Sequence, residues 1–191
     1  MGTIKTTNIE PIADNGTVTL GSSGDTFTLG SGVLQSNLNY PAFFARLDGS
    51  QVVNDNTATK VTINEEYFDT DNCFDHQTNY RFLPNVAGKY FLYGQIWFDA
   101  VNNGNNLNQA TIYLYKNTSD LISLNRLDFR NTYAGRFNTL TTSFIADANG
   151  SSDYFELFGN VNVQSLGSQG FYATSANTDG YTTFGAYRIG S

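Results

Sequence analysis

The stretch from Tyr80 to Asp99, YRFLPNVAGKYFLYGQIWFD, decides the fold because it holds the end of one strand, a turn and one long aromatic strand. Side chains of a strand alternate between the two faces of a sheet. One face here carries Tyr90, Leu92, Gly94, Ile96 and Phe98, and the other carries Phe91, Tyr93, Gln95 and Trp97. Since an antiparallel sheet on its own core needs only one apolar face, we expect the second face to contact a neighbouring subunit.

The composition favours strands over all 191 residues. Charged residues make up 14% of the chain and aromatic residues 15%, with many Asn, Thr, Ser and Gly. No window has apolar residues at helical spacing, so the chain is predicted to be all-β. The net charge of −7 is dispersed and includes no Lys/Arg cluster. Nucleic acid is therefore not an expected partner, because binding to a phosphate backbone depends on such clusters.

Cysteine usage and hydropathy indicate the compartment. Cys73 is the only cysteine, so no intrachain disulfide forms, and stability must come from packing or oligomerisation. No apolar run approaches the roughly 20 residues that span a bilayer, and the first residues lack a signal-peptide core. We therefore expect that the protein does not insert into a membrane. We also expect that it is assembled in a cytoplasm.

Residues 1–40 differ from the rest of the chain. Thr17–Leu20 and Thr26–Leu29 alternate polar and apolar residues, and Gly and Ser follow each segment. Such a short repeat gains stability only against another chain or another copy. We predict an attachment or stalk segment over residues 1–40 and a head domain over residues 41–191.

The head is predicted to contain nine strands, which turn signals such as Asp48-Gly49, Ala87-Gly88 and Asn149-Gly150 separate. The strands are Ala42–Leu47, Lys60–Asn64, Tyr80–Leu83, Gly88–Asp99, Gln109–Lys116, Leu121–Phe129, Leu140–Ala146, Asp153–Val163 and Thr182–Ile189.

Long and short connections alternate after the strand at 88–99. Because successive antiparallel strands run in opposite directions, the long connections are predicted to share one end of the head, and residues 1–40 to leave from the other. Aromatic and small polar residues in such loops are typical of contacts with glycans and proteins. The candidates for an external ligand are Phe171, Tyr172, Tyr181, Asn105, Asn106, Tyr133 and Arg136.

Short motifs of the head follow the order of a known family. They are Phe43 and Ala45, Phe68-Asp69, Phe74-Asp75, Phe82-Leu83-Pro84, Ala87-Gly88-Lys89-Tyr90-Phe91, Leu114-Tyr115-Lys116-Asn117, Asp153-Tyr154 and Phe184-Gly185-Ala186. In these motifs the head resembles the globular head of complement component C-one-q and its tumour-necrosis-factor relatives. It departs from that pattern at Leu92 and Gly94, where the family has aromatic residues. The resemblance implies an antiparallel jelly-roll sandwich that assembles as a homotrimer.

A trimer would bury the second aromatic face of the long strand. The interface candidates are Phe91, Tyr93, Trp97, Tyr113 and Tyr115. At roughly 25 cal/mol per Å² of apolar surface, one buried aromatic side chain in each subunit contributes several kcal/mol per trimer.

The first residues are similar to a different group of proteins. IKTTNI at residues 4–9 and GTVTLGSSGDT at residues 16–26 are similar to the opening of tail-fibre-type virion proteins of marine bacteriophages, some of which carry the same jelly roll. This similarity implies a bacteriophage virion protein that is assembled in the host cytoplasm.

Residues with catalytic or metal-binding chemistry are few. His76 is the only histidine, and no Gly-x-Ser-x-Gly motif accompanies it, so a loop role is favoured. Asp69, Asp71 and Asp75 are weak candidates for calcium, because the glycine and terminal glutamate of an EF-hand are absent. Turn capping by Asp69 and Asp75 is the favoured alternative. We predict no enzyme activity and no cofactor.

Three functions remain open. The first is a trimeric fibre or spike tip, in which residues 1–40 attach to another virion protein and the long loops bind a glycan or protein receptor on the host surface. The second is a capsid decoration protein that does not bind a receptor. A polysaccharide depolymerase is the least favoured, since it needs clustered carboxylates in a cleft.

Overall fold

The computed structural model describes residues 9, 18–19, 21–26, 28, 31, 39–100, 105–129, 135–165, 167, 169–172 and 182–190. By its contacts the chain divides into two units, Met1–Ser36 and Asn37–Ser191. No helix of the described residues is long and apolar enough to cross a membrane.

The first unit contains a turn at Ser22–Asp25. The backbone N–H of Ser22 donates to Asp25 Oδ2 at 2.7 Å, and the N–H of Asp25 donates to the carbonyl of Ser22 at 3.0 Å. The alternating segments at 17–20 and 26–29, which favour short strands, lie partly outside the described residues, and their described residues, 18, 19, 26 and 28, are not in strands.

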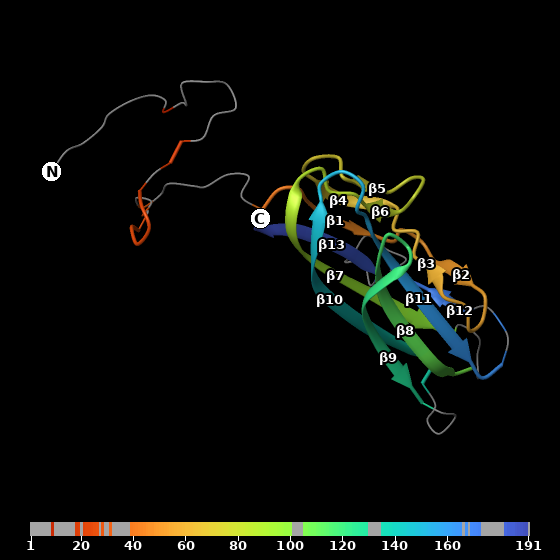
Figure 1. The fold of residues 1–191 in the computed structure, drawn as a ribbon. Coiled ribbons are helices and arrows are strands. Elements are labelled where there is room, and N and C mark those ends of the chain that lie inside the picture. The colour runs from red at the N-terminus through yellow and green to blue at the C-terminus, as the bar shows by residue number, and fades with distance from the viewer. Residues whose placement is uncertain are drawn as a thin grey trace. The chain divides into compact units, whose positions relative to one another are not determined.

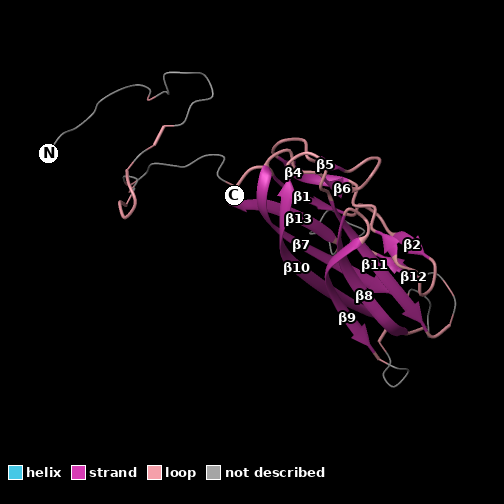
Figure 2. Cartoon of the chain, viewed as in Figure 1, coloured by secondary structure: helices cyan, strands magenta, loops and turns pink. Residues whose placement is uncertain are grey.

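The second unit is a sandwich of two antiparallel sheets, and its described residues form no helix (Figures 1 and 2). Sheet 1 has the order β2 (Gln51–Val53), β12 (Gln169–Phe171), β7 (Ala87–Asp99), β13 (Thr183–Gly190), β1 (Ala42–Arg46) and β4 (Glu65–Asp69), and β10 (Phe137–Asn149) also pairs with β7. Sheet 2 has the order β5 (Phe74–Asp75), β6 (Arg81–Phe82), β11 (Phe155–Val163), β8 (Leu107–Lys116) and β9 (Asp120–Asp128), and β3 (Thr59–Lys60) also pairs with β11. The predicted all-β antiparallel sandwich is confirmed.

The aromatic strand β7 organises sheet 1. It pairs with β10 over its whole length, from Asp99 opposite Phe137 to Ala87 opposite Asn149. Ala87-Gly88 is therefore part of the strand, and its prediction as a turn is wrong because β10 extends far enough to pair with it. The predicted alternation is confirmed, since the residues of the first face other than the glycine are fully buried: Tyr90, Leu92, Ile96 and Phe98.

Aromatic rings fill the space between the sheets. Phe43 stacks on Phe74 with ring centroids 4.3 Å apart, and it contacts Phe82 and Phe184 at 4.7 and 5.1 Å. These four rings come from strands of both sheets, so they hold the sandwich together through contacts distant in sequence.

Gly94 lies on the core-facing side of β7, where the resembled family has an aromatic residue. A Cβ atom at this position would lie 2.5 Å from Cδ1 of Leu157 in β11. The Leu157 side chain occupies the space that a ring would need, so this departure from the family pattern has a packing reason.

The ends of the sandwich have different connections. The register places Asp99 beside Phe137, and Leu107 beside Val163, so the long connections after β7, β9 and β11 start from one end. At the other end, the N–H of Arg188 donates to the carbonyl of Asn39 at 3.1 Å, which brings the start of the head to the end of β13. Both placements agree with the prediction from loop lengths.

Further differences concern the strand predicted at Leu140–Ala146, which extends over Phe137–Asn149 as β10, and the short strands. β2, β4, β5 and β12 have two to five residues each and were not predicted, and the predicted strand at 60–64 is reduced to β3. β12, for example, pairs with the last two residues of β7, whereas β5 pairs with β6, which itself has two residues.

Candidate functional site

Five aromatic side chains form a continuous row on the outer side of sheet 1. The centroids of consecutive rings are 5.2, 6.1, 6.0 and 5.5 Å apart. In order along the row they are Tyr67, Phe44, Tyr93, Phe91 and Tyr187. Three strands besides β7 contribute to this aromatic row, and it contains two of the three β7 residues predicted for the interface, Phe91 and Tyr93 but not Trp97.

Gly185 makes room for the centre of the aromatic row. It pairs with Tyr93 across β13 and β7, and a Cβ atom on it would lie 2.4 Å from the Tyr93 ring. The ring of Tyr93 therefore lies over the β13 backbone. Burial raises the pKa of the Tyr93 phenol, with a smaller contribution from Tyr187.

A shallow hollow of about 560 Å³ continues from the aromatic row over β10 to β9. Phe44 and Tyr93 line one side, and Leu124 of β9 lines the other. At the hollow, β9 of sheet 2 lies close to β10 of sheet 1, and a hydrogen bond of 2.8 Å joins Ser123 Oγ to Thr142 Oγ1. We call β9 and β10 together the β9–β10 edge, and it exposes four apolar residues to between 42% and 54%: Leu121, Leu124, Phe144 and Ile145.

The two interface candidates from β8 belong to a different surface. Tyr113 and Tyr115 contact each other at 5.9 Å, and Tyr115 contacts Phe158 at 5.1 Å on the outer side of sheet 2. The outer sides of two stacked sheets point in opposite directions. The prediction that these tyrosines share one surface with the aromatic residues of β7 is therefore wrong.

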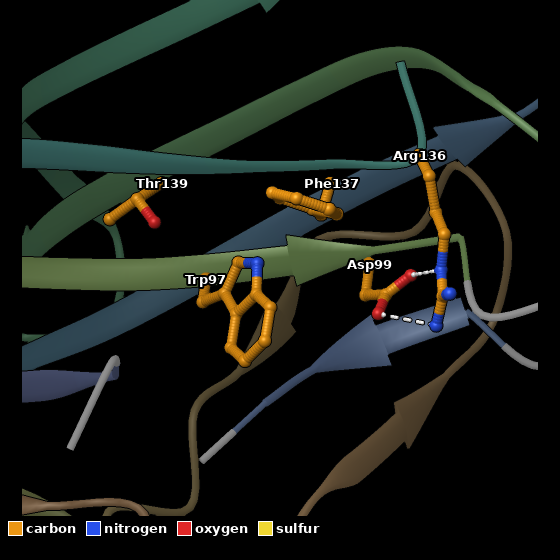
Figure 3. A pocket seen from close by; sticks show the side chains of 5 residues that line it. All are labelled: Trp97, Asp99, Arg136, Phe137 and Thr139. Carbon is orange, nitrogen blue, oxygen red and sulfur yellow. Dashed lines mark hydrogen bonds and ion pairs between the residues drawn. The ribbon is translucent and has the colours of Figure 1, made fainter. Parts of the chain in front are cut away.

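Trp97 lies in a separate pocket at the long-loop end of sheet 1 (Figure 3). The pocket has a volume of about 480 Å³ and is lined by Trp97, Asp99, Arg136, Phe137 and Thr139. β7 contributes the tryptophan and the aspartate, and the start of β10 contributes the phenylalanine and the threonine. We call this the Trp97 pocket.

The aromatic walls of the Trp97 pocket are nearly perpendicular. The rings of Trp97 and Phe137 are 5.9 Å apart at an interplanar angle of 88°, and Tyr172 contacts Trp97 at 6.3 Å and 69°. Tyr172 is held in place by its backbone N–H, which donates to the carbonyl of Trp97 at 3.0 Å. Burial raises the pKa of the Tyr172 phenol, and the nearby Asp99 carboxylate adds to this shift.

An ion pair forms the polar wall of the Trp97 pocket. Arg136 donates through Nε to Asp99 Oδ1 at 2.9 Å and through an Nη group to Oδ2 at 3.2 Å (Figure 3). The Asp99 side chain is 7% exposed and that of Arg136 is 50% exposed. Hydrogen bonding to Asp99 raises the pKa of the Arg136 guanidinium. The planar guanidinium is therefore fixed and faces solvent on one side.

The loop candidates other than Asn105 and Asn106 divide into three groups. Arg136 lines the Trp97 pocket and Tyr172 contacts the Trp97 ring, whereas Tyr133 and Tyr181 lie outside the described residues. Phe171 does not serve as a surface contact, contrary to the prediction, because it is fully buried and packs on Phe98 at 5.6 Å.

Asn105 and Asn106 connect two loops at the same end of the head. Asn105 is buried, and its amide group donates to the carbonyl of Ser165 at 2.8 Å and accepts from the N–H of Ser165 at 3.0 Å. Asn106 donates to Gln164 Oε1 at 3.0 Å. Asn105 therefore positions the loops and offers no ligand contact, which corrects its prediction.

The acidic loop caps its own backbone. Asp69 Oδ2 accepts from the N–H of Phe74 at 2.7 Å, and Asp75 Oδ1 accepts from the N–H of Thr78 at 2.8 Å. Burial of Asp75 opposes its ionisation, but hydrogen bonds from Thr78, Asn79 and Gln77 outweigh it and lower its pKa to about 2. Among the described residues, no three His, Cys, Asp or Glu side chains are arranged to hold a metal ion, and this includes the calcium candidate Asp71.

The sequence did not point to Asp99, Phe137 or Thr139 as site residues. Phe137 and Thr139 fall in the predicted connection before Leu140, and only the pairing with β7 shows that they belong to a strand. The alternation of β7 places Trp97 and Asp99 on one face, which was the available signal.

Comparison with solved structures identifies the fold. Murine APRIL matches with a TM-score of 0.54 and 9% identity over 78% of this chain and 98% of that chain. Eiger TNF from S. frugiperda matches with a TM-score of 0.54 and 9% identity over 80% of this chain and 94% of that chain. The head therefore has a TNF-like jelly-roll fold. The chain matches no family model and no curated protein.

Proposed function

We propose that this chain is a homotrimeric structural protein of a bacteriophage particle, in which the head binds a host-surface receptor at its long-loop end. The proposal rests on the polarity of the head. The chain enters it at Asn39, whereas the Trp97 pocket and the long connections lie at the opposite end. A protein attached to a particle at one end presents the other end outward.

The aromatic row supports the trimeric part of this proposal. It presents five rings in contact on one face, and a monomer would leave Tyr67 and Tyr187 open to water. The exposed apolar side chains of the β9–β10 edge offer a second, different patch on the same molecule. When the edge of one copy packs against the row of the next, the contact is heterologous, and a threefold rotation between copies closes it as a ring of three. Three copies are expected from the jelly-roll resemblance.

The attachment part of the proposal concerns residues 1–40. Their similarity to the opening of tail-fibre-type virion proteins supports a role in binding another particle protein or in intertwining as a stalk. The short repeat with its turn at Ser22–Asp25 is too small for a core of its own. It therefore suits a segment that is stabilised by a partner.

Localisation on the particle tests the whole proposal. An antibody against the purified protein, used in gold-labelling electron microscopy of the phage that encodes it, should mark the ends of fibres or spikes. Even labelling of the capsid shell would instead support a decoration protein. Particles that carry no label, although the antibody recognises the denatured protein in the infected-cell lysate, would refute a virion role.

A further inference from the structure

The Trp97 pocket is separate from the aromatic row. Within the part of the chain that the structure describes, the Trp97 ring contacts Phe137 and Tyr172, whereas Tyr93 contacts Phe44 and Phe91. On β7 the polar residue Gln95 stands between Trp97 and Tyr93. The pocket is therefore available to a ligand when the row is covered by a second copy of the chain.

The walls of the pocket combine two kinds of contact. Trp97 and Phe137 present apolar ring surface, and the Phe137 side chain is 59% exposed. Arg136 and Thr139 present donors to the same space. The bidentate pair with Asp99 uses Nε and Nη2 of Arg136, so Nη1 stays available to donate to a ligand. Sugars have apolar C–H faces and a rim of hydroxyl groups, which match such walls.

Charge and size narrow the ligand class. The Asp99 carboxylate compensates the charge of Arg136, so these two residues together offer no net positive charge to a phosphate or carboxylate. The net charge of −7 on the chain also disfavours anions. The volume of about 480 Å³ falls within the roughly 300–1,000 Å³ that is typical of small-ligand pockets.

We propose that the Trp97 pocket binds one neutral pyranose unit of a bacterial surface polysaccharide. The ring of the sugar packs against Trp97 and Phe137, and its hydroxyl groups bond to Arg136 and Thr139. This inference rests on the proposed function, because it names the receptor chemistry at the long-loop end.

Trp97 provides the assay because it is the only tryptophan of the chain. The full-length protein is titrated with methyl glycosides of glucose, galactose, mannose and N-acetylglucosamine, and with glucuronate and inorganic phosphate as anionic probes. We expect at least one neutral glycoside to change the tryptophan emission in a saturable way. A panel without any saturable change, or a response to the anionic probes only, would overturn the proposal.

Two variants locate the binding site. Phe137→Ala is expected to weaken the affinity for the neutral glycoside by about tenfold or more, and Arg136→Lys to weaken it through loss of the fixed guanidinium. Phe68→Ala is the matched control, because Phe68 is similarly exposed, at 49%, and lies in neither the pocket nor the aromatic row. Unchanged affinity in both pocket variants, measured by calorimetry, would place the sugar elsewhere and refute the site.

The experiments distinguish an error in the proposed saccharide site from an error in the proposed virion role. If gold label marks the fibre ends but the protein binds no neutral glycoside, the saccharide site is wrong and the virion role stands. If a glycoside binds as expected but the particle carries no label, the pocket stands and the virion role is wrong.

Discussion

Replacing Tyr93 by alanine probes the proposed subunit contact most directly, because Tyr93 is the central ring of the aromatic row. An aromatic side chain at the centre of an interface contributes about 2 kcal/mol, and a threefold assembly contains it three times, so the trimer loses about 6 kcal/mol. At about 1.4 kcal/mol per factor of ten, the dissociation constant rises about 10⁴-fold. The midpoint concentration of a monomer–trimer equilibrium follows the square root of this constant, so it rises about 100-fold.

Sedimentation velocity of the full-length protein over the micromolar range measures this shift. Tyr113→Ala is the control, since Tyr113 is also a partly buried tyrosine but lies on the outer side of sheet 2. Wild type and Tyr113→Ala should remain trimeric at concentrations where Tyr93→Ala dissociates. A wild-type protein that is monomeric at low micromolar concentration would refute the reasoning. Dissociation of the Tyr113→Ala variant alone would place the subunit contact on sheet 2 and would contradict the proposed contact through the aromatic row.

Three further predictions concern stability. Lys60→Met leaves the carboxylate of Glu156, which is 1% exposed, without its cation, and should lower the free energy of unfolding by about 3 kcal/mol in chemical denaturation. Lys89→Met removes the exposed pair with Asp147 and should lower it by at most about 1 kcal/mol. Equal losses in the two variants would contradict this account. The pKa of Asp75 is about 2, below its ordinary value of 3.8, so its ionised form stabilises the fold above pH 3.8 and this contribution is lost as the pH falls through 2. Asp75→Asn should therefore lower the melting temperature at pH 7, and the difference from wild type should shrink towards pH 2. Burial raises the pKa of the Cys73 thiol to about 11, so at pH 8 iodoacetamide should modify it only after unfolding, as mass spectrometry can verify; rapid modification of the native protein would show that the thiol is accessible.

The long strands were predictable because their alternation is a local property. β7 differs by one residue from its predicted range, and the two faces read from the sequence are the buried and half-buried faces of the structure. The short strands were not predictable. β12, for example, is a strand because its three residues find the edges of β7 and β2, and nothing within the three residues specifies this pairing.

The residues around the Trp97 pocket were likewise only partly predictable from the sequence. Arg136 and Tyr172 were recognised as loop residues with contact chemistry, but Phe171, the neighbour of Tyr172, was assigned the same role and is fully buried. Side chains that alternate along an extended backbone point to opposite sides, so Phe171 enters the core while Tyr172 contacts the Trp97 ring. The register of β12 on β7 decides which of them does so.

By itself, the sequence determined the all-β class, the core-facing side of the long strand and the opposite placement of the N-terminal entry and the long loops, because strand periodicity and strand parity are local or additive properties of the chain. The tertiary structure decided which aromatic residues meet. It joined Tyr67, Phe44 and Tyr187 to the row on β7, placed Tyr113 on the other sheet, and brought Asp99 and Arg136 into one ion pair. These contacts join residues from distant strands, and only the pairing and stacking of the folded sheets bring such residues together.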